Sequence, residues 1–240
     1  MEKWKEIWNA KKVNNEILSN SCLEAVFMEL KRMDGNDTLT EKGGVTYSAF
    51  RKQYNSLVGY LQGDKDRVNR VFEAGCGSGP FLLLLELDGK QVGGLDYSAS
   101  HIDTARKVLK SPIELYCEEA IDMQTDIKYD CVFTNSMFEY FPDYEYASKV
   151  LEKMFEKSMY SVAVLDVHDR VKEKAYTAYR RQIIHNYDKK YADLKKLFYE
   201  KEFFVDFASS HNMDIRITTS KLEGYWNRDF VFDVYLYKNN

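Results

Sequence analysis

Hydrophobic and polar residues follow two different periods along most of this chain. Short apolar runs, typical of buried strands, occupy residues 70–74, 91–95, 113–117, 129–134 and 161–167. Between them lie segments such as residues 80–87 and 100–109, whose apolar positions recur at the spacing of a helix. Strands that alternate with helices form a parallel sheet with helices on both faces. The pattern therefore predicts an α/β fold.

The two ends of the chain depart from this alternation. Residues 1–62 are predicted to be helical, because Trp4, Ile7 and Trp8 share one helical face and residues 47–61 form a further helical run. Near the other end, apolar and polar residues alternate strictly over 213–218, and residues 230–237 form a further strand-like run with Phe230, Phe232, Val234 and Leu236 on one face. Two such strands without a helix between them must pair antiparallel or lie apart. We therefore predict an N-terminal helical cap (1–62) and an α/β domain (63–240).

A long connection over residues 169–212 separates the fifth strand from the last two. It contains many aromatic residues among many charges. A connection of this length without secondary structure is rare in a compact domain. We predict helices over 170–209, some packed on the sheet and the others forming a lid.

Composition and charge narrow the class of protein. The chain has 240 residues and a net charge of −4, which argues against a polyanion as the main partner. The four cysteines show no spacing typical of a metal site, which favours a reduced cytoplasmic protein without a metal. We find no apolar run of the length that a bilayer requires, and no signal peptide at the N-terminus. The expectation is a protein without a membrane partner.

The most informative motif is VFEAGCGSG at residues 71–79. It leads from an apolar strand through a glycine-rich turn into a helix, and glycines let a backbone approach a ligand closely. Two phosphate-binding motifs do not fit. The dinucleotide motif G-x-G-x-x-G, counted from Gly75, requires glycine where Pro80 stands, and a P-loop requires lysine and serine or threonine after its last glycine. A glycine turn without a ligand stays an alternative.

With Glu73 before the glycines, this stretch reads E-x-G-x-G-x-G and resembles the first motif of the class I methyltransferases, which use S-adenosylmethionine (SAM) and release S-adenosylhomocysteine (SAH). Asp96 at the end of the next strand strengthens the resemblance, as does the segment 129–141. The resemblance covers about residues 67–238. It implies a seven-stranded Rossmann-like sheet with a reversed last strand and helices on both faces.

The resemblance also implies the cofactor contacts, at the carboxyl ends of the strands. The first motif would face the methionine part of SAM, with Asn135 and Ser136 touching its amino-acid part. Asp96 would face the ribose hydroxyls, Tyr97 the adenine ring and Glu119 the adenine amino group. Most family members carry Asp where this chain has Glu119. The predicted cofactor-binding residues are Glu73, Gly75, Cys76, Gly77, Gly79, Asp96, Tyr97, Ser98, Glu119, Ala120, Asn135 and Ser136.

Methyl transfer requires a nucleophile aligned behind the methyl group, and orientation alone can contribute about 7–11 kcal/mol. A general base contributes roughly 10²–10⁴-fold where the acceptor is a hydroxyl. His168, at the end of the fifth strand, is our first candidate because histidine titrates near neutral pH. Glu139 and Tyr140 are further catalytic candidates. A surface or helix-capping role for His168 stays open.

The acceptor is predicted to be a small polar metabolite methylated on oxygen or nitrogen, of a secondary-metabolite or glycan-related kind. The fourth strand lacks the Asn/Asp-Pro-Pro-Tyr/Phe sequence associated with methylation of planar nitrogens, which together with the charge argues against nucleic acid. One alternative is an RNA or protein methyltransferase that recruits its substrate with Arg180, Arg181 and a basic N-terminal helix (Lys3, Lys5, Lys11 and Lys12). The other is a non-catalytic SAM-binding protein. A monomer or a homodimer is expected.

Overall fold

A single twisted sheet organises the molecule. The computed structural model describes residues 2–19, 22–36, 44–62 and 68–239. Seven strands lie in the order β3-β2-β1-β4-β5-β7-β6, and β7 is antiparallel to both of its neighbours. This is the predicted sheet with a reversed last strand. Its strands are β1 (Arg70–Ala74), β2 (Gln91–Leu95), β3 (Glu114–Tyr116), β4 (Tyr129–Asn135), β5 (Ser158–His168), β6 (Met213–Thr219) and β7 (Val231–Lys238).

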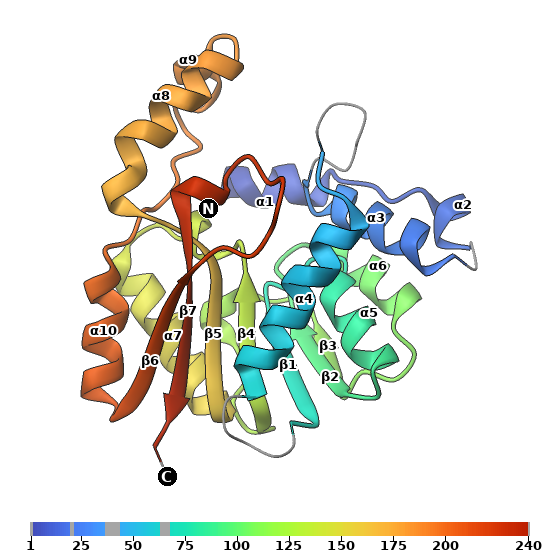
Figure 1. Cartoon of the computed structure of the whole chain (residues 1–240). Coiled ribbons are helices and arrows are strands. Elements are labelled where there is room, and N and C mark those ends of the chain that lie inside the picture. The colour runs from blue at the N-terminus through green and yellow to red at the C-terminus, as the bar shows by residue number, and fades with distance from the viewer. Residues whose placement is uncertain (1, 20–21, 37–43, 63–67, 240) are drawn as a thin grey trace.

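Helices cover both faces of the sheet (Figure 1). On one face, α4 (Tyr47–Gln62) and α5 (Pro80–Leu87) bury Leu57 and Leu84 in a core shared with β1, together with α6 (Ala99–Val108). On the other face, α7 (Tyr144–Lys157) and α10 (Lys201–Ser210) bury Leu151 and Phe204 against β4 and β5. None of the helices in the described residues is long and apolar enough to span a membrane. The two cores confirm the predicted layers.

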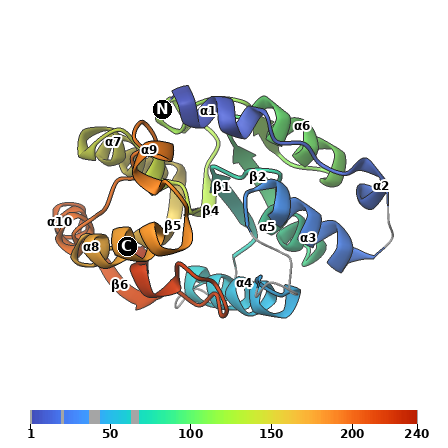
Figure 2. The same cartoon turned by 90° about the horizontal axis from the view of Figure 1, so that it is seen from above.

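The N-terminal part of the chain contributes helices to two places. In sequence order these are α1 (Glu2–Asn9), α2 (Asn15–Leu18) and α3 (Leu23–Met33), followed by α4. Phe27 of α3 and Tyr54 of α4 both pack on Phe81 of α5. In contrast, α1 lies beside α6 at the carboxyl ends of the strands (Figure 2). The first helix is thus separated from the others and lies above the sheet edge.

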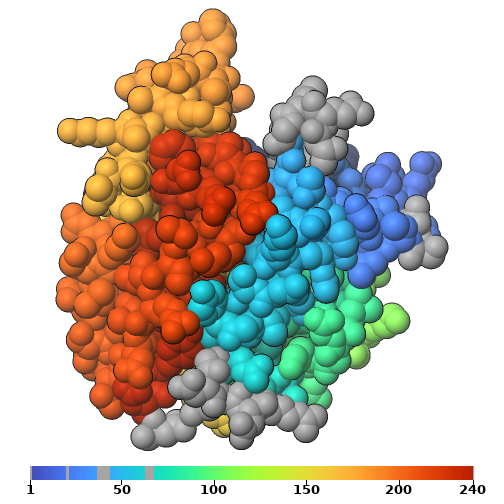
Figure 3. All heavy atoms as spheres, viewed as in Figure 1, coloured from blue at the N-terminus to red at the C-terminus, as the bar shows by residue number. Residues whose placement is uncertain are grey.

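The long connection contains α8 (Glu173–Ile183) and α9 (Tyr187–Lys190) before α10. Helix α10 packs on β6, whereas α8 and α9 project beyond the carboxyl edge of the sheet (Figures 1 and 3). Residues 192–199 are not helical, contrary to our expectation for this part. The reason is tertiary, because buried Tyr199 ties the segment to the sheet by donating its hydroxyl to the carbonyl of Phe138 at 2.8 Å. The division into a cap (1–62), a second domain (63–240) and a lid (170–209) stays a prediction. The second domain was expected to begin at residue 63, and residues 63–67 lie outside the described residues.

Gly93 in β2 shows how tightly the sheet core is packed. A Cβ atom added at this position would overlap the hydroxyl of buried Tyr129 and lie 3.0 Å from a ring carbon of Phe72. By contrast, a Cβ atom at Gly59 in α4 would meet nothing within 4 Å. The two glycines therefore offer a matched pair of substitutions.

We expect Gly93→Ala to lower the free energy of unfolding by about 1–3 kcal/mol, because overpacking forces neighbours from their preferred positions. Gly59→Ala should raise the same quantity by roughly 0.5–1 kcal/mol, because alanine loses less backbone entropy in a helix. Urea unfolding followed by circular dichroism measures both. Equal effects of the two substitutions would contradict the packing described for β2.

Candidate functional site

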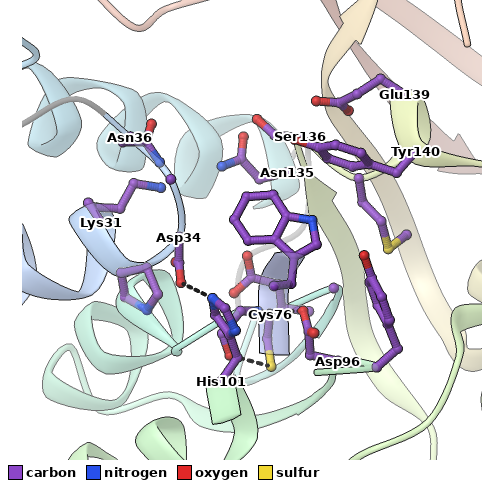
Figure 4. A pocket seen from close by; sticks show the side chains of 18 of the residues that line it. Lys31, Asp34, Asn36, Cys76, Asp96, His101, Asn135, Ser136, Glu139 and Tyr140 are labelled. Carbon is purple, nitrogen blue, oxygen red and sulfur yellow. Dashed lines mark hydrogen bonds and ion pairs between the residues drawn. The ribbon is translucent and has the colours of Figure 1, made fainter. Parts of the chain in front are cut away.

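A pocket opens at the carboxyl edge of the sheet, and Trp8 of α1 is one of the residues that line it. Figure 4 shows most of the lining side chains. Residues from the glycine turn, from the end of β2 and from the segment after β4 line it. Ten of the residues predicted from the sequence are among them, namely Glu73, Gly75, Cys76, Gly77, Asp96, Tyr97, Asn135, Ser136, Glu139 and Tyr140. The structure therefore brings most of the predicted cofactor residues, and two of the predicted catalytic ones, into one place.

Five predicted residues do not line this pocket. Gly79 precedes α5 in a left-handed conformation, with a φ of 84°. Ser98 is buried behind Asp96; it precedes α6, yet its hydroxyl contacts His101 and makes no capping hydrogen bond. Glu119 Oε1 lies 3.7 Å from Lys5 Nζ, and Ala120 begins a short 3-10 turn. The fifth, His168, has a separate environment.

The glycine turn depends on conformations that favour glycine. Gly75 and Gly77 have φ values of 69° and 54°, in the left-handed region. The amide of Gly77 donates to Asp96 Oδ2 at 3.0 Å, and the amide of Ser78 donates to Asp34 Oδ1 at 2.9 Å. A Cβ atom at Gly77 would lie 2.7 Å from Asp34 Oδ1. Two carboxylates thus hold this turn from opposite sides.

Asp96 is a buried carboxylate that two backbone amides hold in one orientation. Its Oδ1 accepts from the Ser98 amide at 2.8 Å, while its Oδ2 accepts from Gly77. Burial raises the pKa of Asp96, an effect that nearby His101 and the two amides oppose. Each carboxylate oxygen has a second lone pair. Asp96 can therefore accept further hydrogen bonds from a ligand in the pocket.

Asp34 is a site residue that the sequence analysis missed. It follows α3 and accepts at Oδ1 from the Ser78 hydroxyl at 2.7 Å, in addition to the Ser78 amide. His101 Nε2 lies 3.6 Å from the same oxygen (Figure 4), and His101 Nδ1 lies 2.8 Å from the Ser98 hydroxyl. The N-terminal helices therefore complete the pocket, to which Trp8 and Lys31 also contribute. Their sequence carries no motif, so tertiary structure alone identifies them.

Glu73 and Lys31 are buried ionisable groups of opposite charge. Each has an exposed fraction of only 3%. Burial raises the pKa of Glu73 well above its ordinary value and lowers the pKa of Lys31. Glu73 Oε2 has no hydrogen-bond partner in the part of the chain that the structure describes. An unpaired buried carboxylate at the pocket wall is costly unless a ligand supplies donors.

The segment after β4 forms another wall of the pocket. Ser136 has a φ of 54°, and its hydroxyl donates to Asp166 Oδ2 at 2.9 Å. Asp166 in β5 also has a positive φ, of 57°, where the pairing of β5 with β7 is irregular. Asn135 Oδ1 is buried without a partner among the described residues. Strain of this kind is found at binding sites, where the surrounding structure compensates for it.

Glu139 and Tyr140 lie in a short 3-10 turn, Phe138–Tyr140. Glu139 Oε1 is 3.5 Å from Lys196 Nζ, and Glu139 Oε2 is buried without a partner among the described residues. Burial raises the pKa of Glu139, and Lys196 opposes this effect. Lys196 comes from the long connection and also lies over the Tyr140 ring, 4.7 Å from its centroid. A carboxylate capable of holding a proton is thus placed at the pocket wall.

His168 lies away from the pocket in a fully buried aromatic environment. Its ring centroid is 5.0 Å from those of both Tyr176 and Phe198, and its Nε2 is 2.9 Å from Asn227 Nδ2. Burial lowers the pKa of His168 well below its ordinary value, and Lys196 contributes to this shift. Burial therefore favours the neutral form of this imidazole.

The arginines considered for a macromolecular partner lie on α8. The Arg180 guanidinium is 4.7 Å from the centroid of the Trp226 ring and donates to the Tyr191 hydroxyl at 3.1 Å. Arg181 is more exposed and pairs with Asp188 at 3.0 Å. Neither arginine lines the pocket. Both are engaged by neighbours on or beside the projecting helices.

The chain resembles known proteins both in sequence and in fold. Residues 71–157 match the family described as a methyltransferase domain. A peramine synthetase of Metarhizium majus is 30% identical over 132 residues, and a malonyl-[acyl-carrier protein] O-methyltransferase of Ilyobacter polytropus is 27% identical over 121 residues. These alignments cover 49% and 48% of this chain. They cover only 5% and 45% of the relatives, so the chain spans less than half of either length.

Solved structures share the fold at low sequence identity. A plantazolicin methyltransferase in complex with SAH gives a TM-score of 0.61 at 16% identity, covering 100% of this chain and 98% of that one. The magnesium protoporphyrin IX methyltransferase of Synechocystis, with bound SAH, gives 0.61 at 15% identity over 86% and 90% of the two chains. Residues 71–157 therefore match a methyltransferase domain, and the chain has the Rossmann-like fold of the class I methyltransferases. The predicted resemblance is confirmed.

We expect Asp34→Ala to lower the free energy of unfolding by about 1–3 kcal/mol, because it leaves the buried Ser78 amide without its acceptor and the Ser78 hydroxyl with the Leu30 carbonyl alone. Asp103→Ala, which removes an exposed acidic side chain on α6, is the matched control and should change stability by less than about 0.5 kcal/mol. Chemical unfolding of both variants measures the difference. If the two variants were equally stable, Asp34 would not hold the glycine turn.

Proposed function

We propose that this protein is a SAM-dependent methyltransferase that methylates an oxygen or nitrogen of a small polar acceptor. The observation that carries the proposal is the glycine turn held beside Asp96, with unpartnered polar atoms of Glu73 and Asn135 at the same pocket. These groups are acceptors for hydroxyl and ammonium donors. The solved relatives of the same fold contain SAM or SAH.

The charges of the pocket fit SAM. This cofactor has a sulfonium, an ammonium and one carboxylate, and therefore a net positive charge. Among the described lining residues, the carboxylates of Asp34, Glu73, Asp96 and Glu139 outnumber the single ammonium of Lys31. Asp96 would accept from the ribose hydroxyls, and Glu73 and Asn135 from the ammonium. An excess of negative charge with low-dielectric walls attracts a cationic ligand.

The acceptor would approach from the side of Glu139 and Tyr140. When bound, SAM supplies a methyl group already activated on sulfur, so the protein has to orient the acceptor and take up its proton. Glu139 is the better placed base, because it lines the pocket and has an unpartnered buried oxygen. Tyr140 would orient the acceptor beside it. His168 stays a second candidate, although its ring lies outside the pocket lining.

A small acceptor is supported by how the pocket is enclosed. Helix α1 lies over the carboxyl edge, and Trp8 from this helix lines the pocket together with Tyr225. The lining carboxylates would repel the phosphates of RNA. Arg180 and Arg181, which an RNA-binding alternative would use, already contact aromatic rings and Asp188. The remaining alternative is a protein that binds SAM without catalysis. A screen for SAH release over sugars, amines and phosphorylated metabolites distinguishes it from our proposal, because only a methyltransferase would release SAH.

We expect Asp96→Ala to weaken binding of SAH at least about tenfold, because hydrogen bonds to a charged group contribute roughly 1.5–3 kcal/mol. Asp206→Ala, an exposed acidic position on α10, is the control and should bind like the parent. Isothermal titration calorimetry measures both affinities. An unchanged affinity of Asp96→Ala would contradict the ribose contact, and a parent that binds neither SAM nor SAH would refute the proposed function.

We expect Glu139→Gln to lower kcat roughly 10²–10⁴-fold with little change in SAH affinity, because the amide cannot accept the proton of the acceptor. In the parent, kcat/KM should rise with pH through the pKa of Glu139, which burial raises, because only the ionised carboxylate is a base. The variant should lose this rise. Rates of SAH release from the acceptor that the screen identifies test both statements, with the exposed Glu202→Gln as control. An unaltered pH profile would exclude Glu139 as the base.

A further inference from the structure

Lys31 is a buried cation for which the described residues offer no hydrogen-bond acceptor or ion-pair partner. It comes from the last turn of α3, and its side chain lines the pocket, with an exposed fraction of 3%. Its ammonium lies over the rings of Phe81 and Phe50, 4.7 Å and 5.0 Å from their centroids. No described residue forms a hydrogen bond or an ion pair with it, although the carboxylates of Asp34 and Glu73 lie near enough to influence its charge.

Such a lysine is costly if its role is structural. Contact with two aromatic faces contributes about 2 kcal/mol at a desolvated site, whereas removing an ammonium from water costs several kcal/mol. A leucine or methionine would fill the same space between Phe50 and Phe81 without that cost. An anionic ligand in the pocket would satisfy the ammonium and offset its desolvation.

The place of Lys31 in the pocket indicates which anion it would meet. Lys31 and Asp96 lie on opposite sides of the pocket, with Cys76 of the glycine turn between them (Figure 4). A nucleoside whose ribose is held at Asp96 would extend its other end along the turn toward Glu73 and Lys31. In SAM that end carries an ammonium and a carboxylate on the same carbon atom. Glu73 and Lys31 match these two charges.

We propose that Lys31 binds the carboxylate of the amino-acid end of SAM and thereby selects nucleosides that carry this carboxylate. The inference rests on the proposed function, because it specifies one contact of the same site. It makes α3 part of the binding site: the helix supplies both Lys31 and, directly after it, Asp34, which holds the glycine turn. Glu73 of the glycine motif would then bind the ammonium of the ligand, and Lys31 of α3 would bind its carboxylate.

The test compares SAH with its carboxamide, in which a neutral amide replaces the carboxylate. We expect the parent to bind SAH about tenfold to a hundredfold more tightly than the amide, the range expected for a charge-assisted hydrogen bond. Lys31→Met should lose this preference because only its affinity for SAH falls, to the affinity that the parent has for the amide. Lys31→Arg should keep most of the preference, since it keeps the charge. Calorimetry measures all affinities.

The exposed Lys174→Met on α8 is the matched control and should bind both ligands like the parent. Equal weakening of both ligands by Lys31→Met would show a structural role and overturn the inference, with the proposed function intact. If the parent bound SAH and its carboxamide with equal affinity, the inference would be wrong. This comparison needs no variant and therefore holds even if Lys31→Met fails to fold. A parent that binds neither ligand would overturn the proposed function, and the inference with it.

Discussion

The position of the glycine turn between two carboxylates determines the rest of the site. Asp96 receives the Gly77 amide from the end of β2, and Asp34 receives the Ser78 amide from the end of α3. These two acceptors hold a backbone whose left-handed glycines would otherwise have many conformations. Because Asp34 belongs to the N-terminal helices, these helices and the sheet have to dock correctly before the pocket exists. The pocket therefore depends on tertiary assembly rather than on a local loop.

Buried charge is the second property that unites the site. Glu73, Asp96, Asp166 and Glu139 are all buried near the carboxyl edge, where burial raises the pKa of each. Lys31 opposes the shift of Glu73, Lys196 that of Glu139, and both lysines that of Asp166. Such a concentration of ionisable groups destabilises a fold unless ligands or hydrogen bonds compensate for it. Perturbed carboxylates in a pocket are typical of functional sites. The cationic cofactor that we propose would supply part of this compensation.

The long connection acts on the site through a few anchored residues. Tyr199 fixes the segment to the carbonyl of Phe138, and the amide of Leu197 donates to the carbonyl of Glu139 at 2.8 Å. These bonds place Lys196 beside Glu139 and bury His168 behind Phe198. The same segment therefore brings one ionisable group to the pocket and encloses another away from it.

The sequence by itself determined the sheet, its reversed last strand and half of the residues that line the pocket, because alternation, glycine spacing and strand ends are local properties of the chain. It also placed Asp96, Glu139 and Asn135 correctly at the carboxyl edge. Only the tertiary structure decided that Asp34 and Lys31, whose helix carries no motif, line the pocket and that His168 is buried. Those outcomes depend on which segments distant in sequence pack together, and the packing free energy that selects them is a sum over the whole core.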